Sequence, residues 1–275
     1  MTCGVVVSCY NNWDTIRRCL AALAAQTRRP DVVVLADDGS LPPSDPSIFH
    51  QPFGSLIHVW HPDAGNTKPA MLNRAVAQLE TDVVLFVDGD CLAHRRFVED
   101  HLALLRDNPG RYVQGSRAEI LRAWTSGFDP DFPTVIRYAA AGKITSRIKA
   151  FRFPKLLRRW VWGGPYYPCG SNISLRRQDF IRVNGYDERF SGFGNEDNDF
   201  CYRLQGAGVM PVMAPGSCIL YHLGHPLLAR SETNSAQLAE KLKAGDMGSH
   251  PGFEGTCERT PAPEVRRYPG NPAQK

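Results

Sequence analysis

The chain has 275 residues, of which 43% are hydrophobic and 22% are charged, so it contains enough apolar side chain to bury a full core. The formal net charge is only +4, and no long run of basic residues alternating with aromatic ones dominates the sequence. This composition excludes a largely disordered chain and argues against nucleic acid as a partner. We expect one elaborated domain.

The cysteines and the apolar runs suggest where such a protein resides. Eight cysteines are scattered along the chain without any Cys-x-x-Cys pair, a pattern typical of buried thiols in a reducing compartment. The apolar stretch at residues 5–9 is too short for the core of a signal peptide, and no window approaches the length of a transmembrane helix. We therefore expect a cytoplasmic protein, either free or peripheral at the inner face of the membrane.

Apolar periodicity predicts alternating strands and helices through the first half of the chain. Strands are expected at residues 4–8, 31–36, 56–60, 82–87 and 112–116, and helices at 13–23, 68–79 and 97–105. The first four strands are continuously hydrophobic, which is typical of a mostly parallel sheet covered by helices on both faces. The order of elements predicts a doubly wound α/β fold.

The second half has a less regular pattern. Residues 121–162 mix aromatic and basic side chains without a clear period. After them, strands are expected at 169–175, 209–214 and 218–222, and helices at 178–183 and 196–205. We predict a domain at residues 1–228, divided into 1–117 and 118–228. Residues 229–275 are rich in Gly, Pro and Glu, and we expect a loosely ordered tail there.

Acidic turns follow two of the predicted strands. Asp88, Gly89 and Asp90 come directly after strand 82–87, and two carboxylates on one tight turn suit a hard divalent cation that also binds a diphosphate. Alone, this Asp-x-Asp pattern is more often a polar turn that ends a strand. Asp37 and Asp38 end an earlier strand, where they either bind a nucleoside or cap the next segment. Because ligands bind beyond the carboxyl ends of such strands, we expect one shared crevice.

Glu196 and Asp197 open a predicted helix after the loop at residues 192–195. Capping of the helix N-terminus explains the carboxylates but not the glycines before them, which would make room for a substrate. A carboxylate beside a diphosphate leaving group is suited to deprotonate an acceptor hydroxyl. We predict that Asp197 is this general base, with Glu196 beside it.

Two histidines follow the last predicted strand, at His222 and His225. A lone histidine after a strand is more often structural. Together with the Asp-x-Asp turn, however, neutral imidazole is a suitable third ligand for a manganese-like ion. We predict that His222 binds the metal, and the role of His225 stays open.

These motifs together resemble the family-2 glycosyltransferases of the nucleotide-diphospho-sugar transferase (GT-A) fold. The segments that carry the resemblance in the first half are residues 5–27, 37–40 and 81–91. In the second half, residues 169–174, 184–190 and 194–197 resemble the acceptor-side region of chondroitin-polymerase-like enzymes and β-1,4-galactosyltransferases. Phe193 stands where these relatives usually carry Trp, which leaves the acceptor undefined.

The resemblance implies an inverting sugar transfer from a nucleotide-sugar, expected to be a UDP-sugar, with Mn²⁺ or Mg²⁺ as cofactor. The acceptor would be a hydroxyl of a carbohydrate or lipid-linked molecule, in bacterial polysaccharide, cell-envelope or glycoconjugate synthesis. The implied site residues are Ser8, Tyr10, Asp38, Lys68 and Asp88 for the donor, Asp88, Asp90 and His222 for the metal, and Asp197 and Glu196 for catalysis.

The fold expected from the sequence also allows two other functions, nucleotidyl transfer and nucleotide-sugar binding without catalysis. A nucleotidyltransferase would need a glycine-rich phosphate loop after the first strand, and this chain has none there. A catalytically silent nucleotide-sugar-binding module would lack the base or the metal ligands. The four residues expected in these roles, Asp88, Asp90, Asp197 and His222, are all present.

The segment from Lys143 to Trp162 has seven basic residues and no acidic one up to Arg159. Interleaved apolar residues make it either a mobile cationic lid, a surface that contacts anionic lipid, or a helix packed on the core with solvated charges. Pro154 interrupts any long helix, so none of these alternatives is favoured.

Overall fold

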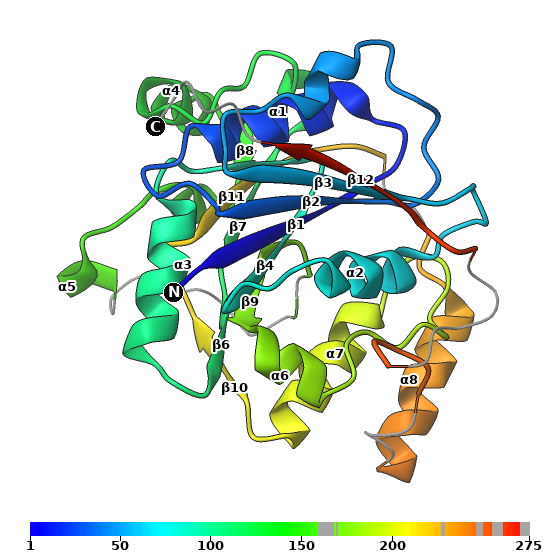
Figure 1. The fold of residues 1–275 in the computed structure, drawn as a ribbon. Helices are drawn as coiled ribbons and strands as arrows, with labels where there is room; N and C mark the ends of the chain where they lie inside the picture. The colour runs from blue at the N-terminus through cyan, green and yellow to red at the C-terminus, as the bar shows by residue number, and fades with distance from the viewer. Residues whose placement is uncertain (159–167, 169, 227–228, 246–249, 255–260, 270–275) are drawn as a thin grey trace.

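A computed structural model of the protein describes residues 1–158, 168, 170–226, 229–245, 250–254 and 261–269. It contains two sheets (Figure 1). The larger sheet has, in spatial order, β10 (Met210–Met213), β6 (Arg111–Gln114), β9 (Ile173–Arg176), β4 (Val83–Asp88), β1 (Cys3–Cys9), β2 (Val32–Asp37), β3 (Ser55–Trp60) and β12 (Glu264–Pro269). The smaller sheet has the order β5 (Cys91–Ala93), β11 (Ile219–Leu223), β7 (Ser116–Ile120) and β8 (Ile144–Thr145).

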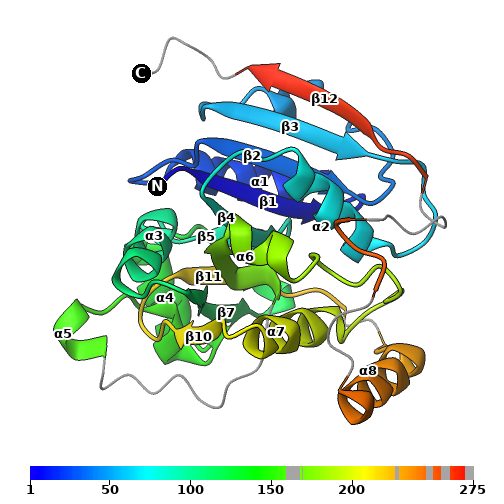
Figure 2. The same cartoon turned by 60° about the horizontal axis from the view of Figure 1, so that its bottom comes forward.

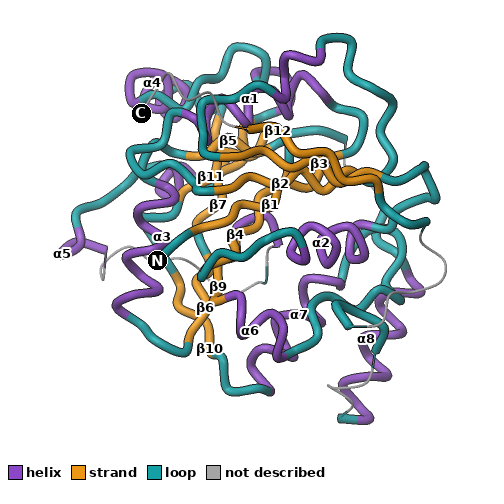
Figure 3. The backbone as a smooth tube through the Cα atoms, viewed as in Figure 1, coloured by secondary structure: helices purple, strands orange, loops and turns teal. Residues whose placement is uncertain are grey.

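The helices lie on both faces of the larger sheet, as Figure 3 shows for α1 on one side and α2, α6 and α7 on the other. The α-helices in the described residues are α1 (Trp13–Ala24), α2 (Lys68–Ala77), α3 (Phe97–Asp107), α4 (Phe132–Ala140), α5 (Lys155–Arg158), α6 (Arg177–Arg182), α7 (Glu196–Gly206) and α8 (Glu232–Ala244).

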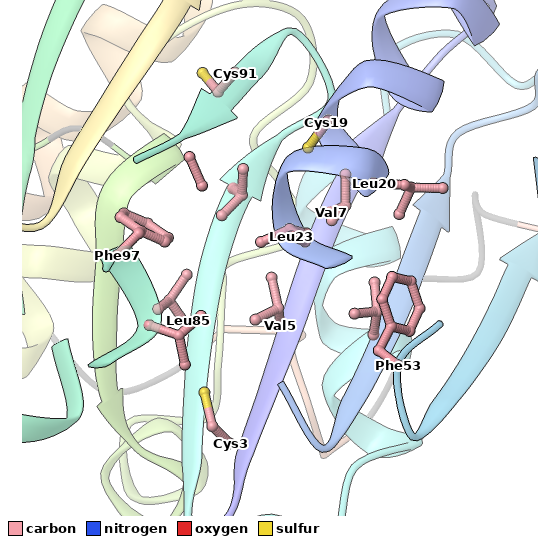
Figure 4. Close-up of a cluster of buried hydrophobic side chains, with 14 of the residues drawn as sticks. Cys3, Val5, Val7, Cys19, Leu20, Leu23, Phe53, Leu85, Cys91 and Phe97 are labelled. Carbon is pink, nitrogen blue, oxygen red and sulfur yellow. The ribbon is translucent and has the colours of Figure 1, made fainter. Parts of the chain in front are cut away.

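Alternate residues of the central strand pack against the two helical layers. Val5 and Val7 of β1 join Leu20 and Leu23 of α1 in one buried cluster (Figure 4). Val6 belongs to a second cluster with side chains of α2, α6 and α7. Burying one such aliphatic side chain contributes about 1.5–3 kcal/mol, so both faces of β1 hold the sheet in place.

Four central strands, β4, β1, β2 and β3, run parallel to their neighbours, as expected for the doubly wound half. The register places Ser8 beside Asp88 and Cys9 beside Asp37. The polar turns after β1, β2 and β4 therefore meet at one edge of the sheet, as the sequence predicted.

The expectation that residues 229–275 are loosely ordered is wrong where the structure describes them. They contain α8 and β12, and β12 extends the sheet by pairing antiparallel with β3. Tyr268 of β12 stacks on Phe49 with ring centroids 4.8 Å apart. Strand β12 is an exposed edge strand, and the buried side chains of α8 are polar. Neither element therefore has the apolar periodicity by which strands and helices are predicted from sequence.

The basic segment contacts α3 through ion pairs. Arg152 and Arg158 both bind the buried carboxylate of Asp100, with nitrogen–oxygen distances of 2.8 and 3.4 Å. Lys155 lies 2.8 Å from Asp107. This part of the segment is packed on α3, but it differs from the packed alternative because only residues 155–158 form an α-helix and these three charges are paired rather than solvated. Residues 159–162 lie outside the described residues.

The six cysteines in the described residues are free and buried, at positions 3, 9, 19, 91, 201 and 218. Cys169 and Cys257 lie outside the described residues. Among the residues that the structure describes, no helix is both long and apolar enough to cross a bilayer.

Candidate active site

Asp88 at the end of β4 is held by two neighbours. Ser8 donates its hydroxyl to Asp88 Oδ1 at 2.6 Å, and Nζ of Lys68, the first residue of α2, lies 2.7 Å from the same oxygen. Burial disfavours the charged form of Asp88, but Lys68 and Ser8 outweigh it and lower the pKa to about 2. Burial also opposes the charge on Lys68, yet the nearby carboxylates raise its pKa above the ordinary value. The pair is therefore ionised at neutral pH.

Asp38 contacts the segment that leads into α2. Its Oδ2 accepts a hydrogen bond from the backbone N–H of Thr67 at 2.8 Å, and His61 Nε2 lies 3.1 Å from Oδ1. Thr67 directly precedes Lys68, so one short segment joins Asp38 to Asp88. Thr67 and His61 were not predicted as site residues from the sequence, because neither belongs to a recognisable motif.

Tyr10 and Asp37 have different surroundings. Tyr10 is 52% exposed, and its hydroxyl donates to Asp63 at 2.9 Å. Asp37 is fully buried, where His58 Nε2 lies 2.8 Å from Oδ2 and the backbone of Ser40 donates to Oδ1 at 2.9 Å. Asp37 therefore stabilises the turn, whereas Tyr10 is open to a ligand.

Glu196 and Asp197 begin α7, as predicted, and carry carboxylate oxygens that are not satisfied. Asp197 Oδ2 accepts the backbone N–H of Gly170 at 3.0 Å. Within the described part of the chain, Asp197 Oδ1 and Glu196 Oε2 are buried without a hydrogen-bond partner. A Cβ at Gly170 would lie 1.9 Å from Asp197 Oδ1, so glycine is required for this close approach.

The surroundings of these two carboxyl groups favour proton uptake. Burial, followed by the charge of Asp197, raises the pKa of Glu196 to about 7. Burial also raises the pKa of Asp197, although Lys68 opposes the shift. Carboxylates with raised pKa values and unpaired oxygens are suited to accept a proton near neutral pH.

Asp90, His222 and His225 form a compact set of metal-type ligands. One ligand atom from each lies within 4.8 Å of the others. Asp90 Oδ2 is 3.4 Å from His222 Nε2 and 3.2 Å from His225 Nε2. A carboxylate oxygen and imidazole nitrogens fit a divalent ion such as Mn²⁺. Among the described residues this set includes His225, which the sequence left open, and does not include Asp88.

Glu119 of β7 orients His222. It lies 2.5 Å from His222 Nδ1, and Arg117 donates to Glu119 at 2.8 Å. Such a partner fixes the imidazole so that Nε2 faces Asp90. The strand predicted from the sequence ended at residue 116, so Glu119 was not predicted as a site residue. The signal that could have revealed this strand is the alternation of the charged Arg117 and Glu119 with the small or apolar residues 116, 118 and 120.

A mostly parallel α/β sheet with this polar edge defines a GT-A glycosyltransferase fold, and the comparisons with known proteins agree. Residues 4–183 match the model of glycosyl transferase family 2, and the chain belongs to this family. Residues 153–226 also match a model described as the N-terminal domain of galactosyltransferase. The family and the fold predicted from the sequence are therefore confirmed.

Three curated relatives are similar over most of this chain. Validoxylamine A glucosyltransferase of Streptomyces hygroscopicus subsp. limoneus is 26% identical over 75% of this chain and 48% of the relative. Chondroitin synthase of Escherichia coli is 26% identical over 74% of this chain and 32% of the synthase. N-acetylglucosaminyl-diphospho-decaprenol L-rhamnosyltransferase of Mycobacterium tuberculosis is 27% identical over 80% of this chain and 76% of that enzyme. The chain thus spans half or less of the first two relatives.

Solved structures show the same fold. S. aureus TarS aligns with a TM-score of 0.56 and 16% identity, covering 82% of this chain and 37% of that one. TarS 1–349 in complex with UDP aligns with a TM-score of 0.56 and 15% identity, covering 86% of this chain and 63% of that one.

Proposed function

We propose that this protein transfers a sugar from a UDP-sugar to an acceptor hydroxyl with inversion at the anomeric carbon, using Mn²⁺ or Mg²⁺. The observation that carries this proposal is the pair Glu196 and Asp197, whose buried, unpaired oxygens belong to the same electrostatic cluster as the Lys68–Asp88 ion pair. The relatives are named for glucosyl and rhamnosyl transfer, and one structural neighbour was solved with UDP, which supports the donor class.

The donor would lie across the carboxyl ends of the central strands. In this proposal Asp38, held by Thr67, accepts a hydrogen bond from the uracil, while Ser8 and Tyr10 line the nucleoside. Asp88 binds the ribose. Lys68 offsets the negative charge of the diphosphate, as a half-buried cation can do more strongly than one in bulk water.

Asp90 and His222, with His225 beside them, would hold the divalent ion, and Asp88, whose Oδ1 contacts Lys68 and Ser8, would be a further ligand. A bound divalent ion supplies charge neutralisation to the departing diphosphate. Glu119 keeps the His222 ring oriented toward this site.

Asp197 is the proposed general base. It takes the proton of the acceptor hydroxyl while the acceptor oxygen bonds to the anomeric carbon and the bond from that carbon to the diphosphate breaks. UDP leaves with the bonding electrons, and attack from the opposite face inverts the carbon. Gly170 provides the space and a backbone N–H that keeps Asp197 in place.

Release of UDP from a panel of UDP-sugars tests this function. We expect slow release with Mn²⁺ that stops with EDTA, since water can replace the acceptor. Thermal stabilisation by each donor identifies the preferred one, because a bound ligand stabilises the folded state by mass action. If donors bind but no metal-dependent release occurs, the chain is a binding module, and the transferase proposal is wrong.

We propose that the acceptor is a carbohydrate or lipid-linked molecule and that α4 contacts the membrane surface. Phe132 and Ile136 of α4 are 69% and 43% exposed and lie one turn apart, whereas Val135 and Tyr138 of the same helix are buried. Further exposed apolar side chains between residues 121 and 157 are Leu121, Trp124, Ile148, Leu156 and Leu157. Arg147 and Lys149 add cations that form no ion pair with described residues.

We expect the protein to co-sediment with anionic vesicles at low salt and to be released as salt screens the attraction. Replacing Arg147 and Lys149 with Gln should weaken this binding, as should Phe132→Ser with Ile136→Ser. The matched control is Lys243→Gln, an exposed lysine on α8. A parent protein that ignores anionic vesicles at low salt would refute the membrane contact.

A further inference from the structure

Helix α8 lies beyond the residues matched by either family model and packs beside α7 (Figure 1 and Figure 2). It begins at the cap residue Ser231, whose hydroxyl accepts the backbone N–H of Asn234 at 3.2 Å. Its buried side chains are Asn234 and Lys241. A helix that buries polar side chains is held by specific partners. Those partners lie in the loop at residues 192–195, in α7 and in the turn that contains Asp187.

The first turn of α8 holds the loop at residues 192–195. Asn234 Nδ2 donates to the Gly194 carbonyl at 2.8 Å, and the backbone of Ser231 donates to the Phe193 carbonyl at 3.0 Å. Asn195 returns a hydrogen bond to Ser235 at 3.0 Å. Gly194 and Asn195 have φ values of 101° and 75°, in the left-handed region that is outside regular secondary structure. The loop is also held by the backbone N–H of Gly192, which donates to the Asn66 carbonyl at 3.3 Å, so α8 supplies three of its contacts rather than all of them.

The last turns of α8 hold the start of α7. Lys241 is 7% exposed, and its Nζ lies 2.8 Å from Asp187 and also binds Asp199. Asp199 stands two residues after Asp197 in the first turn of α7, and its other oxygen accepts Arg203 Nε at 2.8 Å. The buried ammonium group of Lys241 thus links α8 to α7 through Asp199, and to the turn before the 192–195 loop through Asp187.

We propose that Lys241 and Asn234 are positioning residues that hold the 192–195 loop and the first turn of α7, so that Glu196 and Asp197 face the acceptor. This inference rests on the proposed function. The residues proposed for the donor come from β1, β2, α2 and β4 instead, so loosening α8 should impair the proton transfer and leave donor binding intact. Misplacement of a catalytic group by about 1 Å can cost about a hundredfold in rate.

The test compares Lys241→Met and Asn234→Ala with the exposed control Lys243→Met. With the UDP-sugar that the parent hydrolyses fastest, kcat for UDP release should fall about tenfold or more in the first two variants. The Kd of UDP with Mn²⁺ should stay within about twofold, as the donor residues are untouched. Amide hydrogen exchange at residues 192–200 should accelerate in both variants and not in the control. Lys241→Arg should restore part of kcat.

Two results would overturn the inference: unchanged exchange at 192–200 in both variants, or faster exchange with kcat equal to that of the parent. If Lys241→Met does not fold, Asn234→Ala still decides, because it removes one hydrogen bond and no charge. A parent that releases no UDP from any donor contradicts the proposed function itself, and the exchange measurement then tests whether α8 holds the loop.

Discussion

Asp197→Asn is expected to lower turnover about a hundredfold or more while the Kd of the donor changes little, since a general base contributes on this scale. Asparagine has nearly the same shape and can still accept the Gly170 N–H, but it cannot take a proton at neutral pH. Single-turnover measurement of UDP release separates this loss from donor binding. Asp129→Asn, at an exposed carboxylate, serves as the control and should match the parent.

The substitution Asp197→Asn should lower turnover without lowering the thermal stability of the protein. The folded pKa of Glu196 is about 7, above its ordinary value of 4.5, so the folded state binds this proton more tightly than the unfolded chain. The resulting stability is present below pH 4.5 and is lost as pH rises to about 7. Above pH 7 the charge of Asp197 disfavours the ionised form of Glu196 in the folded state. Asp197→Asn removes this repulsion, so the variant should melt at or above the parent Tm at pH 8.

Unchanged turnover in Asp197→Asn would contradict the first prediction and transfer the role of base to Glu196.

The sequence predicted the central sheet because its strands are buried on both faces and therefore read as continuous apolar runs. The same runs end in Ser8, Asp38 and Asp88, and the parallel register brings those ends together. These parts of the fold and the candidate site follow from local pattern and from one topological rule.

The missed parts depend on contacts between distant segments. Lys241 reads as one more surface lysine of a polar helix, and only its partners Asp187 and Asp199, more than 40 residues away, make it a buried residue. Glu119 lies 103 residues from His222, and no spacing rule connects them. Polar side chains that are buried by pairing carry no hydrophobic signal, so sequence periodicity cannot locate them.

Asp90→Ala is expected to weaken Mn²⁺-dependent binding of UDP about a hundredfold or more. Asp90 supplies the carboxylate shared by His222 and His225, and without it the two imidazoles offer no negative charge to the ion. Even residues that only orient metal ligands typically change metal affinity by about 10–100-fold, so a direct ligand should cost at least the upper end. Calorimetric titration of UDP with Mn²⁺ and with EDTA measures the effect.

Graded variants then separate the roles around Asp90. His222→Ala should approach the loss seen for Asp90→Ala, because the ring is buried and oriented by Glu119. His225→Ala should cost less, because its side chain is 43% exposed, whereas that of His222 is 7% exposed. Glu119→Gln keeps a hydrogen bond to His222 but removes the charge, so its effect should fall between the two. If Asp90→Ala binds UDP and Mn²⁺ as tightly as the parent, the ion is held elsewhere, and Asp88 becomes the carboxylate to replace next.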